Sequence, residues 1–230
     1  MSNSLFDQCA AYLLAQASRS PEAPSLPPIA VTISRETGAG AVTIAQRVAD
    51  YLQAYRPDPH CPWAVFDKNL VHKVLEEHRL PKHIEAFLPE NTTSRVVDTV
   101  EDIIGLHPTA EALVRKTSDT VFRLALRGNV VLVGRGSNII TASHKHVFHV
   151  RLVAPFEQRV RHVRQYYHLS REAAEKFVTQ TDRARRRYVK RHFRAKIDDP
   201  LAYDLTVNTG RLSFEDAAIM IGAATLRRCG

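Results

Sequence analysis

The chain has 230 residues, enough for one sizeable domain with a substantial hydrophobic core. Its hydrophobic fraction of 44% and charged fraction of 24% are those of an ordinary globular protein and exclude a disordered or fibrous chain. The net charge of +8 and the pI near 9.6 predict an anionic partner, which would be nucleotide phosphates, nucleic acid or an acidic surface.

The cysteines and the N-terminal composition favour a reducing, aqueous compartment. Cys9, Cys61 and Cys229 are odd in number and widely spaced, which is typical of free thiols. The N-terminus lacks the basic region and apolar core of a secretory signal. No apolar run approaches the roughly 20 residues that span a bilayer. We therefore expect a cytoplasmic protein without a membrane partner.

The first predicted element is an amphipathic helix over residues 3–18, with apolar side chains at i, i+4 spacing. The proline-rich segment 20–28 cannot continue this helix and is predicted to be a linker. Residues 1–28 would then be an appendage of a domain over 29–230. The helix would dock on that domain or on a partner, and a homo-oligomer formed through it is one such arrangement.

From residue 29 onward, predicted strands alternate with predicted helices. The strands span 29–34, 63–66, 129–134, 146–153 and 203–207. The helices span 42–55, 68–79, 92–104, 109–127, 155–167, 170–180, 181–196 and 213–227. This alternation predicts an α/β fold whose parallel five-stranded sheet is covered on both faces.

The residues that follow the strands are the candidate site, because ligands of such sheets bind outside the carboxyl ends of the strands. These residues are Ser34–Gly40, Asp67 with Lys68, Gly134–Gly136 and Asn208–Gly210. We expect them to meet in one cleft although they are distant in sequence. Glu36 and Asp67 are the acids best placed there to meet Mg²⁺ or a substrate hydroxyl.

The turn after the first strand has the order strand, glycines, helix, which aims backbone N–H groups at a phosphate. When the pattern GxxxxGK[ST] is laid over it, Arg35 falls at the first glycine and Gly40 at the second. The lysine position is then Ala41 and the hydroxyl position Val42, with Thr43 one place later. The sequence therefore predicts a phosphate cradle that lacks its usual cation.

Two other interpretations of the same glycines stay open. Gly38 and Gly40 would also fit a tight turn without a ligand. They begin a dinucleotide pattern, GxGxxG, whose third position is Thr43 instead of the small residue that close packing requires. An oxidoreductase that binds NAD(P) is therefore a weaker alternative.

Arginines are the candidate source of the missing charge. Arg135 lies between two glycines at the end of a buried strand, where its planar guanidinium matches a phosphate; the alternative is an interdomain salt bridge. Arg159 follows the next strand and is a second candidate for the cleft. Arg35 is expected to reach back across the glycine turn.

The segment 182–194 carries more positive charge than a helix needs for solubility. Like charges at i, i+4, such as Arg183 with Arg187, destabilise a helix modestly, so an anion should compensate. That anion would be a triphosphate under a mobile lid or, less favoured, a nucleic-acid backbone. Only Tyr188 and Phe193 are interleaved, too few for base stacking.

In combination, these residues resemble the cytidylate kinase-like family, a branch of the nucleoside monophosphate kinases, from about Ile29 to Ile221. The segments that carry the resemblance are Ile33–Gly40, Phe66–Lys68, Val133–Asn138, His149–Pro155 and Tyr203–Thr209. The resemblance implies a P-loop three-layer fold with a helical acceptor-binding region and a basic helical lid over about 168–200. It also implies phosphoryl transfer from ATP, with Mg²⁺, to a CMP-like nucleoside monophosphate or a related small acceptor.

Residue roles follow from the resemblance by position. The donor phosphates would be wrapped by Gly38, Ala39, Gly40, Ala41, Val42 and Thr43. Arg135 would bind the acceptor phosphate and Asp67 would lie near the acceptor. Arg183 and Arg185, with Arg159 in support, would supply charge from the lid, and Asn208 and Thr209 would lie beside the donor base. The alternative function is a catalytically weak nucleotide sensor with a degenerate loop.

Overall fold

The computed structural model describes residues 5–17, 27–58, 61–67 and 110–229. Five strands form one sheet, all parallel, in the order β2-β3-β1-β4-β5. The strands are β1 (Ala30–Arg35), β2 (Ala64–Asp67), β3 (Val130–Val133), β4 (Val147–Val153) and β5 (Leu205–Asn208). This confirms the predicted fold class, an α/β fold of the P-loop kinase-like type.

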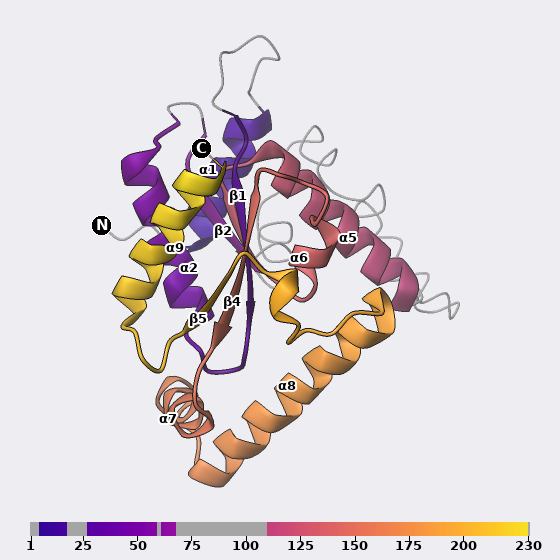
Figure 1. Cartoon of the computed structure of the whole chain (residues 1–230), viewed down its shortest axis with the longest axis vertical. Helices are drawn as coiled ribbons and strands as arrows, with labels where there is room; N and C mark the ends of the chain where they lie inside the picture. The colour runs from indigo at the N-terminus through magenta and orange to yellow at the C-terminus, as the bar shows by residue number, and fades with distance from the viewer. Residues whose placement is uncertain (1–4, 18–26, 59–60, 68–109, 230) are drawn as a thin grey trace.

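Helices cover both faces of the sheet (Figure 1). On one face, α2 (Ala41–Tyr55) and α9 (Phe214–Cys229) pack on the main hydrophobic core, to which β1 contributes Val31 and Ile33. On the other face, α1 (Leu5–Ala17) and α5 (Ala110–Arg127) enclose a second core. Successive strand residues point to opposite faces, so Ala30, Thr32 and Ser34 of the buried strand β1 face away from Val31 and Ile33.

The N-terminal helix docks on the body of the domain. Cys9 and Tyr12 of α1 are fully buried in the second core. The Tyr12 hydroxyl donates a hydrogen bond of 2.8 Å to the carbonyl oxygen of Gly128, and its ring meets Phe66 edge-on at 5.4 Å between centroids. Of the two docking modes expected from the sequence, the structure shows the contact with the body. A homo-oligomer through this helix stays a prediction.

We expect Tyr12→Phe to lower the free energy of unfolding by about 1 kcal/mol, because the buried carbonyl of Gly128 loses a donor while the ring packing is kept. The matched control is Leu14→Ala on the same helix, whose side chain is 48% exposed. Urea unfolding curves of the two variants test this. Equal midpoints would show that the Tyr12 hydroxyl contributes nothing to stability.

Two more helices lie beyond the carboxyl ends of the strands, α7 (Phe156–Tyr167) and α8 (Arg171–Phe193) (Figure 1). They pack on each other through a small separate core that includes Val160 and Val178. The turn between them uses a left-handed residue, His168, at φ 53°. These two helices cover the carboxyl ends of the strands.

The expected division of this region into helices 170–180 and 181–196 is wrong, because α8 runs unbroken for 23 residues. No glycine or proline interrupts it, and repulsion between like charges, about 0.2–0.5 kcal/mol per pair, is too weak to break a helix that is anchored by Val178 and Val189. It ends at Phe193 because Arg194 is left-handed at φ 53°.

The remaining differences are small. A short helix, α6 (Ser137–Ile140), and a 3₁₀ turn, η3 (Pro200–Ala202), were not predicted from the sequence. The helices expected over 68–79 and 92–104 lie outside the described residues. None of the helices in the described ranges is long and apolar enough to cross a membrane.

Candidate functional site

The glycine turn after β1 lies tightly against its neighbours. Gly38 and Gly40 have φ of +86° and +78°, which L side chains rarely adopt. A Cβ on Gly38 would lie 2.5 Å from the carbonyl oxygen of Arg159, and one on Gly40 would lie 2.3 Å from the ring of Phe214. Both glycines are therefore required by backbone conformation and by close approach to α7 and α9.

The start of α2 offers backbone donors to an anion. Gly40 is its N-cap and contributes no side-chain hydrogen bond. Amide N–H groups at such an end, together with the helix dipole, favour negative charge. Ala41, at the lysine position, is only 8% exposed and packs in the main core, whereas Val42 and Thr43 are exposed. The turn therefore offers backbone donors, and Ala41 supplies no cation beside them.

Four arginines from four segments gather at the carboxyl edge of the sheet. They are Arg35 of β1, Arg135 after β3, Arg151 of β4 and Arg185 of α8, and we call them the arginine cluster. Burial, and then the charges of the other three, lower the pKa of Arg35 to about 9, against the opposing effect of Asp67. Arg35 therefore stays charged at neutral pH.

The arginine cluster carries a surplus of positive charge. Burial lowers the pKa of Arg185, and Arg135 and Arg151 lower it further, while Asp182 raises it. Arg151 is 5% exposed and donates to the hydroxyl oxygen of Ser34 at 2.9 Å. Among the described residues, Arg151 forms no ion pair with a carboxylate. Confined like charges favour a bound anion, which would relieve their repulsion.

Arg135 faces α8. Its guanidinium carbon lies 4.7 Å from the centroid of the Tyr188 ring on α8, within cation–π range. The neighbouring Gly136 backs onto Phe193, where an added Cβ would approach the ring to 2.5 Å. Arg135 and α8 therefore meet at the sheet edge, as the sequence predicted.

A carboxylate of α8 holds the glycine turn. The Oδ1 atom of Asp182 accepts hydrogen bonds from the backbone N–H of Thr37 at 2.8 Å and from its hydroxyl at 2.6 Å. Its Oδ2 atom accepts from Nη1 of Arg159 at 2.7 Å. Nη1 of Arg185 donates to the Thr37 hydroxyl oxygen at 2.6 Å and lies 3.3 Å from Asp182 Oδ1. We call these four residues the Asp182 clasp.

Arg159 lies in this clasp and not in an open cleft. Its side chain is 9% exposed, and Nη1 also donates to the carbonyl oxygen of Thr37 at 3.1 Å. Its Nε donates to the carbonyl oxygen of Ala154 at 2.9 Å and lies 3.3 Å from Glu36 Oε2. Glu36 also accepts from the Ala154 N–H at 3.1 Å. Both residues join the turn to α7.

The other predicted residues lie at different distances from the turn. Thr209 donates from its hydroxyl to the carbonyl oxygen of Ala39 at 3.2 Å, so the segment with Asn208 lies beside the turn, as expected. Asp67 ends β2 and interacts electrostatically with Arg35. Arg183 is exposed on α8, and among the described contacts none joins it to the turn or to the arginine cluster.

A cavity of about 130 Å³ lies beside β4 and β5. Its lining residues are Glu36, Arg151, Val153, Asp198, Pro200, Tyr203 and Thr206. Tyr203 donates from its hydroxyl to the carbonyl oxygen of Ile197 at 2.7 Å, and Arg151 lies 5.9 Å from its ring centroid. Sequence reasoning passed over Arg151 and Tyr203. The signal for Arg151 was a cation inside a strand whose other residues, except His149, are apolar.

The described residues give little support for metal binding by the protein alone. Among them, no group of three or more His, Cys, Asp or Glu side chains is arranged to hold an ion. Mg²⁺ is commonly bound through one or two carboxylates together with substrate phosphates, so this finding is compatible with a metal that arrives on a nucleotide.

Two solved structures are similar to this chain, and the first of them supports the fold. An uncharacterized protein from Eubacterium ventriosum matches with a TM-score of 0.63 at 17% identity, over 87% of this chain and 99% of its own. The protein TT1252 from Thermus thermophilus matches with a TM-score of 0.43 at 19% identity, over 89% of this chain and 100% of its own. No curated protein sequence shows a significant match.

The sequence also matches a family model over residues 30–211, which include every strand of the sheet, the glycine turn and the Asp182 clasp. The chain thus belongs to the cytidylate kinase-like family.

Proposed function

We propose that the protein transfers a phosphoryl group from ATP to a nucleoside monophosphate, CMP-like, or to a related small acceptor. The observation that carries this proposal is the arginine cluster beside an uncapped helix N-terminus. Phosphoryl transfer requires mainly the positioning of phosphates and the stabilisation of charge on the transferring group, and this arrangement offers both.

Each segment has a role in the proposed reaction. The first-turn amides of α2 bind the donor phosphates, and Asn208 with Thr209 lies on the donor-base side. Arg135 binds the acceptor phosphate. Arg35 and Arg185 supply the charge that a lysine at Ala41 would otherwise provide, and Arg185 is held in place by the Asp182 clasp.

Mg²⁺ would enter with ATP and neutralise charge between its phosphates. Asp67 is the carboxylate that fits this part of the site best, because it ends β2 at the carboxyl edge and interacts electrostatically with the arginine cluster through Arg35. Glu36 fits less well, because its Oε2 already meets Ala154 N and Arg159.

The second candidate function is a nucleotide sensor that binds the same ligand without useful turnover. The observation that favours it is the burial of Ala41, which leaves no lysine and little space for one at the usual position. Losing one cation from such a site lowers phosphoryl transfer by orders of magnitude unless another cation replaces it.

Calorimetric titration and a turnover assay separate the two functions. ATP with Mg²⁺, CMP, a bisubstrate dinucleotide and NAD⁺ are titrated, and phosphorylation of each nucleoside monophosphate is measured against an Arg135→Ala control. A kinase binds ATP and exceeds the control with at least one acceptor. ATP binding without turnover above the control indicates the sensor. Absence of ATP binding, or NAD⁺ binding in its place, contradicts both.

A further inference from the structure

The second half of α8 has two chemically different faces. Asp182, Arg185 and Val189 point inward, to the glycine turn and the core. The outward side carries six exposed cations, which we call the outer stripe: Arg183, Arg186, Arg187, Lys190, Arg191 and Arg194. Their spacing of three and four residues places them along one side of the helix.

Within the part of the chain that the structure describes, the outer stripe has no acidic partners. Among the ion pairs of the described residues, none involves any of its six cations. Like charges at i, i+4, such as Arg183–Arg187 and Arg187–Arg191, each destabilise a helix by roughly 0.2–0.5 kcal/mol. The first half of the same helix differs, because Arg171 there pairs with Glu175 at 2.8 Å. Mixed positive and negative charges, as in this first half, are enough to keep a helix surface soluble.

We propose that the outer stripe binds the phosphate backbone of a duplex nucleic acid. From Arg183 to Phe193 the helix rises about 15 Å, at 1.5 Å per residue, and Arg194 follows directly as its C-cap. One strand of a duplex presents a phosphate about every 3.4 Å, so this length faces about five phosphates. Six cations on a rigid rod therefore match the charge density of a duplex strand.

The contact is limited to phosphates. Tyr188 faces Arg135 and Phe193 packs against Gly136, so neither ring is presented as a platform for a base. Backbone contacts carry no sequence information, and we therefore expect binding that does not depend on base sequence. An anionic membrane fits less well, because a helix that lies in a bilayer interface needs an exposed apolar face and Val189 here is buried.

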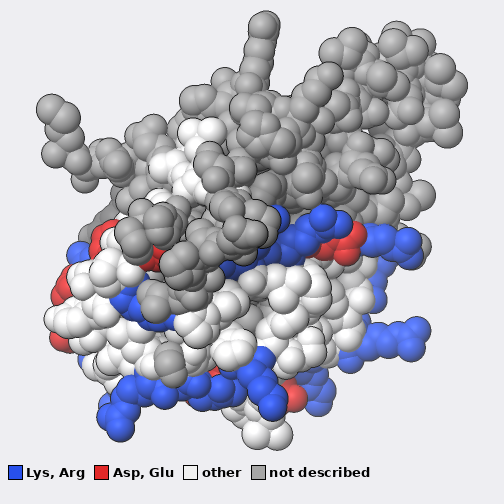
Figure 2. All heavy atoms as spheres, turned by 90° about the horizontal axis from the view of Figure 1, so that it is seen from above, with Lys and Arg blue, Asp and Glu red and all other residues white. Residues whose placement is uncertain are grey.

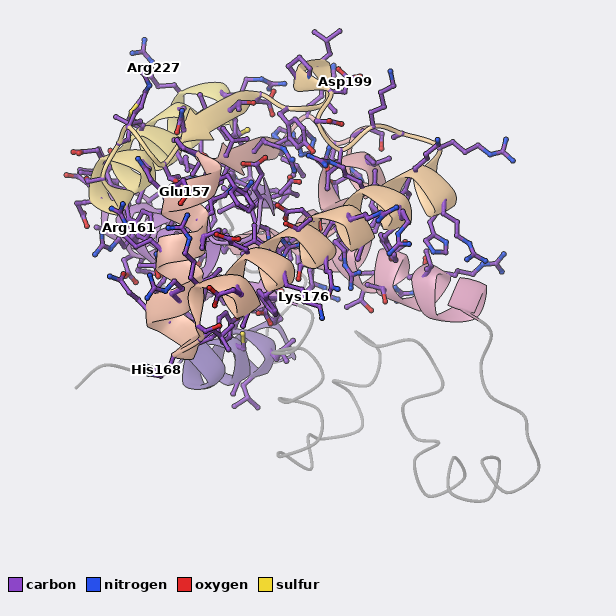
Figure 3. The ribbon with its side chains drawn as sticks, turned by 90° about the horizontal axis from the view of Figure 1, so that it is seen from below. Glu157, Arg161, His168, Lys176, Asp199 and Arg227 are labelled. Atoms are coloured by element: carbon purple, nitrogen blue, oxygen red, sulfur yellow. The ribbon has the colours of Figure 1, made fainter. Side chains whose placement is uncertain are left out.

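The outer stripe is not on the face that Figure 2 shows, where Lys and Arg side chains form bands with some Asp and Glu among them. From below, α8 crosses the molecule as one uninterrupted helix beyond the α7–α8 turn at His168 (Figure 3). Because the Asp182 clasp lies on the opposite side of α8, a duplex on the outer stripe leaves the glycine turn free for a nucleotide.

The test compares two triple variants that lose the same charge. The stripe variant is Arg183→Gln, Arg187→Gln and Arg191→Gln, and the control is Lys145→Gln, Arg161→Gln and Arg227→Gln, three exposed cations elsewhere. Fluorescence anisotropy measures binding to a labelled duplex, to the same sequence as a single strand, and to anionic vesicles, between about 50 and 200 mM salt. Thermal melting of both variants checks that they fold.

The folded wild type should prefer the duplex, and the stripe variant should lose at least tenfold in affinity. The slope of log K against log salt concentration should become less negative by about three in the stripe variant, because each phosphate contact contributes about 0.9 to that slope. The control should keep the wild-type slope. Equal losses in both variants, a preference for the single strand or for vesicles, or no duplex binding at all would each overturn the proposal. ATP titration reports separately on the glycine turn.

Discussion

Replacing Arg185 by glutamine is expected to lower phosphoryl transfer by roughly 100- to 1,000-fold, the usual effect of removing one donor that stabilises transition-state charge. Arg185 is placed for that role because its Nη1 meets the Thr37 hydroxyl at 2.6 Å and its charge adds to those of Arg35 and Arg135. The measurement is the rate of ADP formation with the acceptor that supports turnover.

Arg187→Gln is the matched control, since it removes the same charge two residues along α8 from an exposed position. Turnover of this variant should remain within about twofold of the wild type, which separates the local role of Arg185 from a general loss of positive field. If both variants fall equally, the arginine cluster does not act on the transferring group. If Arg185→Gln keeps full turnover, another cation provides the charge.

The glycine turn and the strand ends could be predicted because their signals are local. A β-branched run, two glycines and an amphipathic helix follow one another within a short stretch, and the carboxyl ends of parallel strands always share one edge. Thus Arg35, Arg135 and Arg185 meet as the sequence indicated, although they come from separate strands and a helix. The parallel topology of the sheet was enough to predict that these three arginines meet.

The Asp182 clasp could not be predicted in the same way. Thr37 and Asp182 are 145 residues apart, and their contact depends on where α7 seats α8 over the sheet. The ion pair of Asp182 with Arg185 is local, three residues along one helix, but nothing in the sequence indicated that the same carboxylate binds a backbone amide. The sequence also placed Arg183 in the site, whereas helical periodicity turns that side chain outward.

The Asp182 clasp has a large expected effect on stability. Its carboxylate is 13% exposed and its partner Arg159 is 9% exposed, so this is a nearly buried ion pair that also satisfies the Thr37 N–H. Removing the carboxylate takes the counter-ion from Arg185 and leaves Arg159 with Glu36 alone. We expect Asp182→Ala to lower the free energy of unfolding by about 3 kcal/mol, and the melting temperature by roughly 6–12 °C for a chain of this size.

Asp182→Asn separates the charge from the hydrogen bonds, because the amide oxygen still accepts from Thr37 while the negative charge is lost. It should be destabilised like Asp182→Ala if the ion pair dominates, and much less if the backbone contact does. Hydrogen exchange of the Thr37 amide is the second measurement, since this N–H loses its acceptor only in the alanine variant.

The control is Arg171→Gln, which removes the cation of two exposed ion pairs near the start of α8 and should leave the melting temperature unchanged. An unchanged melting temperature in Asp182→Ala, together with a protected Thr37 amide, would mean that α8 stays seated without the clasp. The position of Arg185 beside the glycine turn would then need another cause.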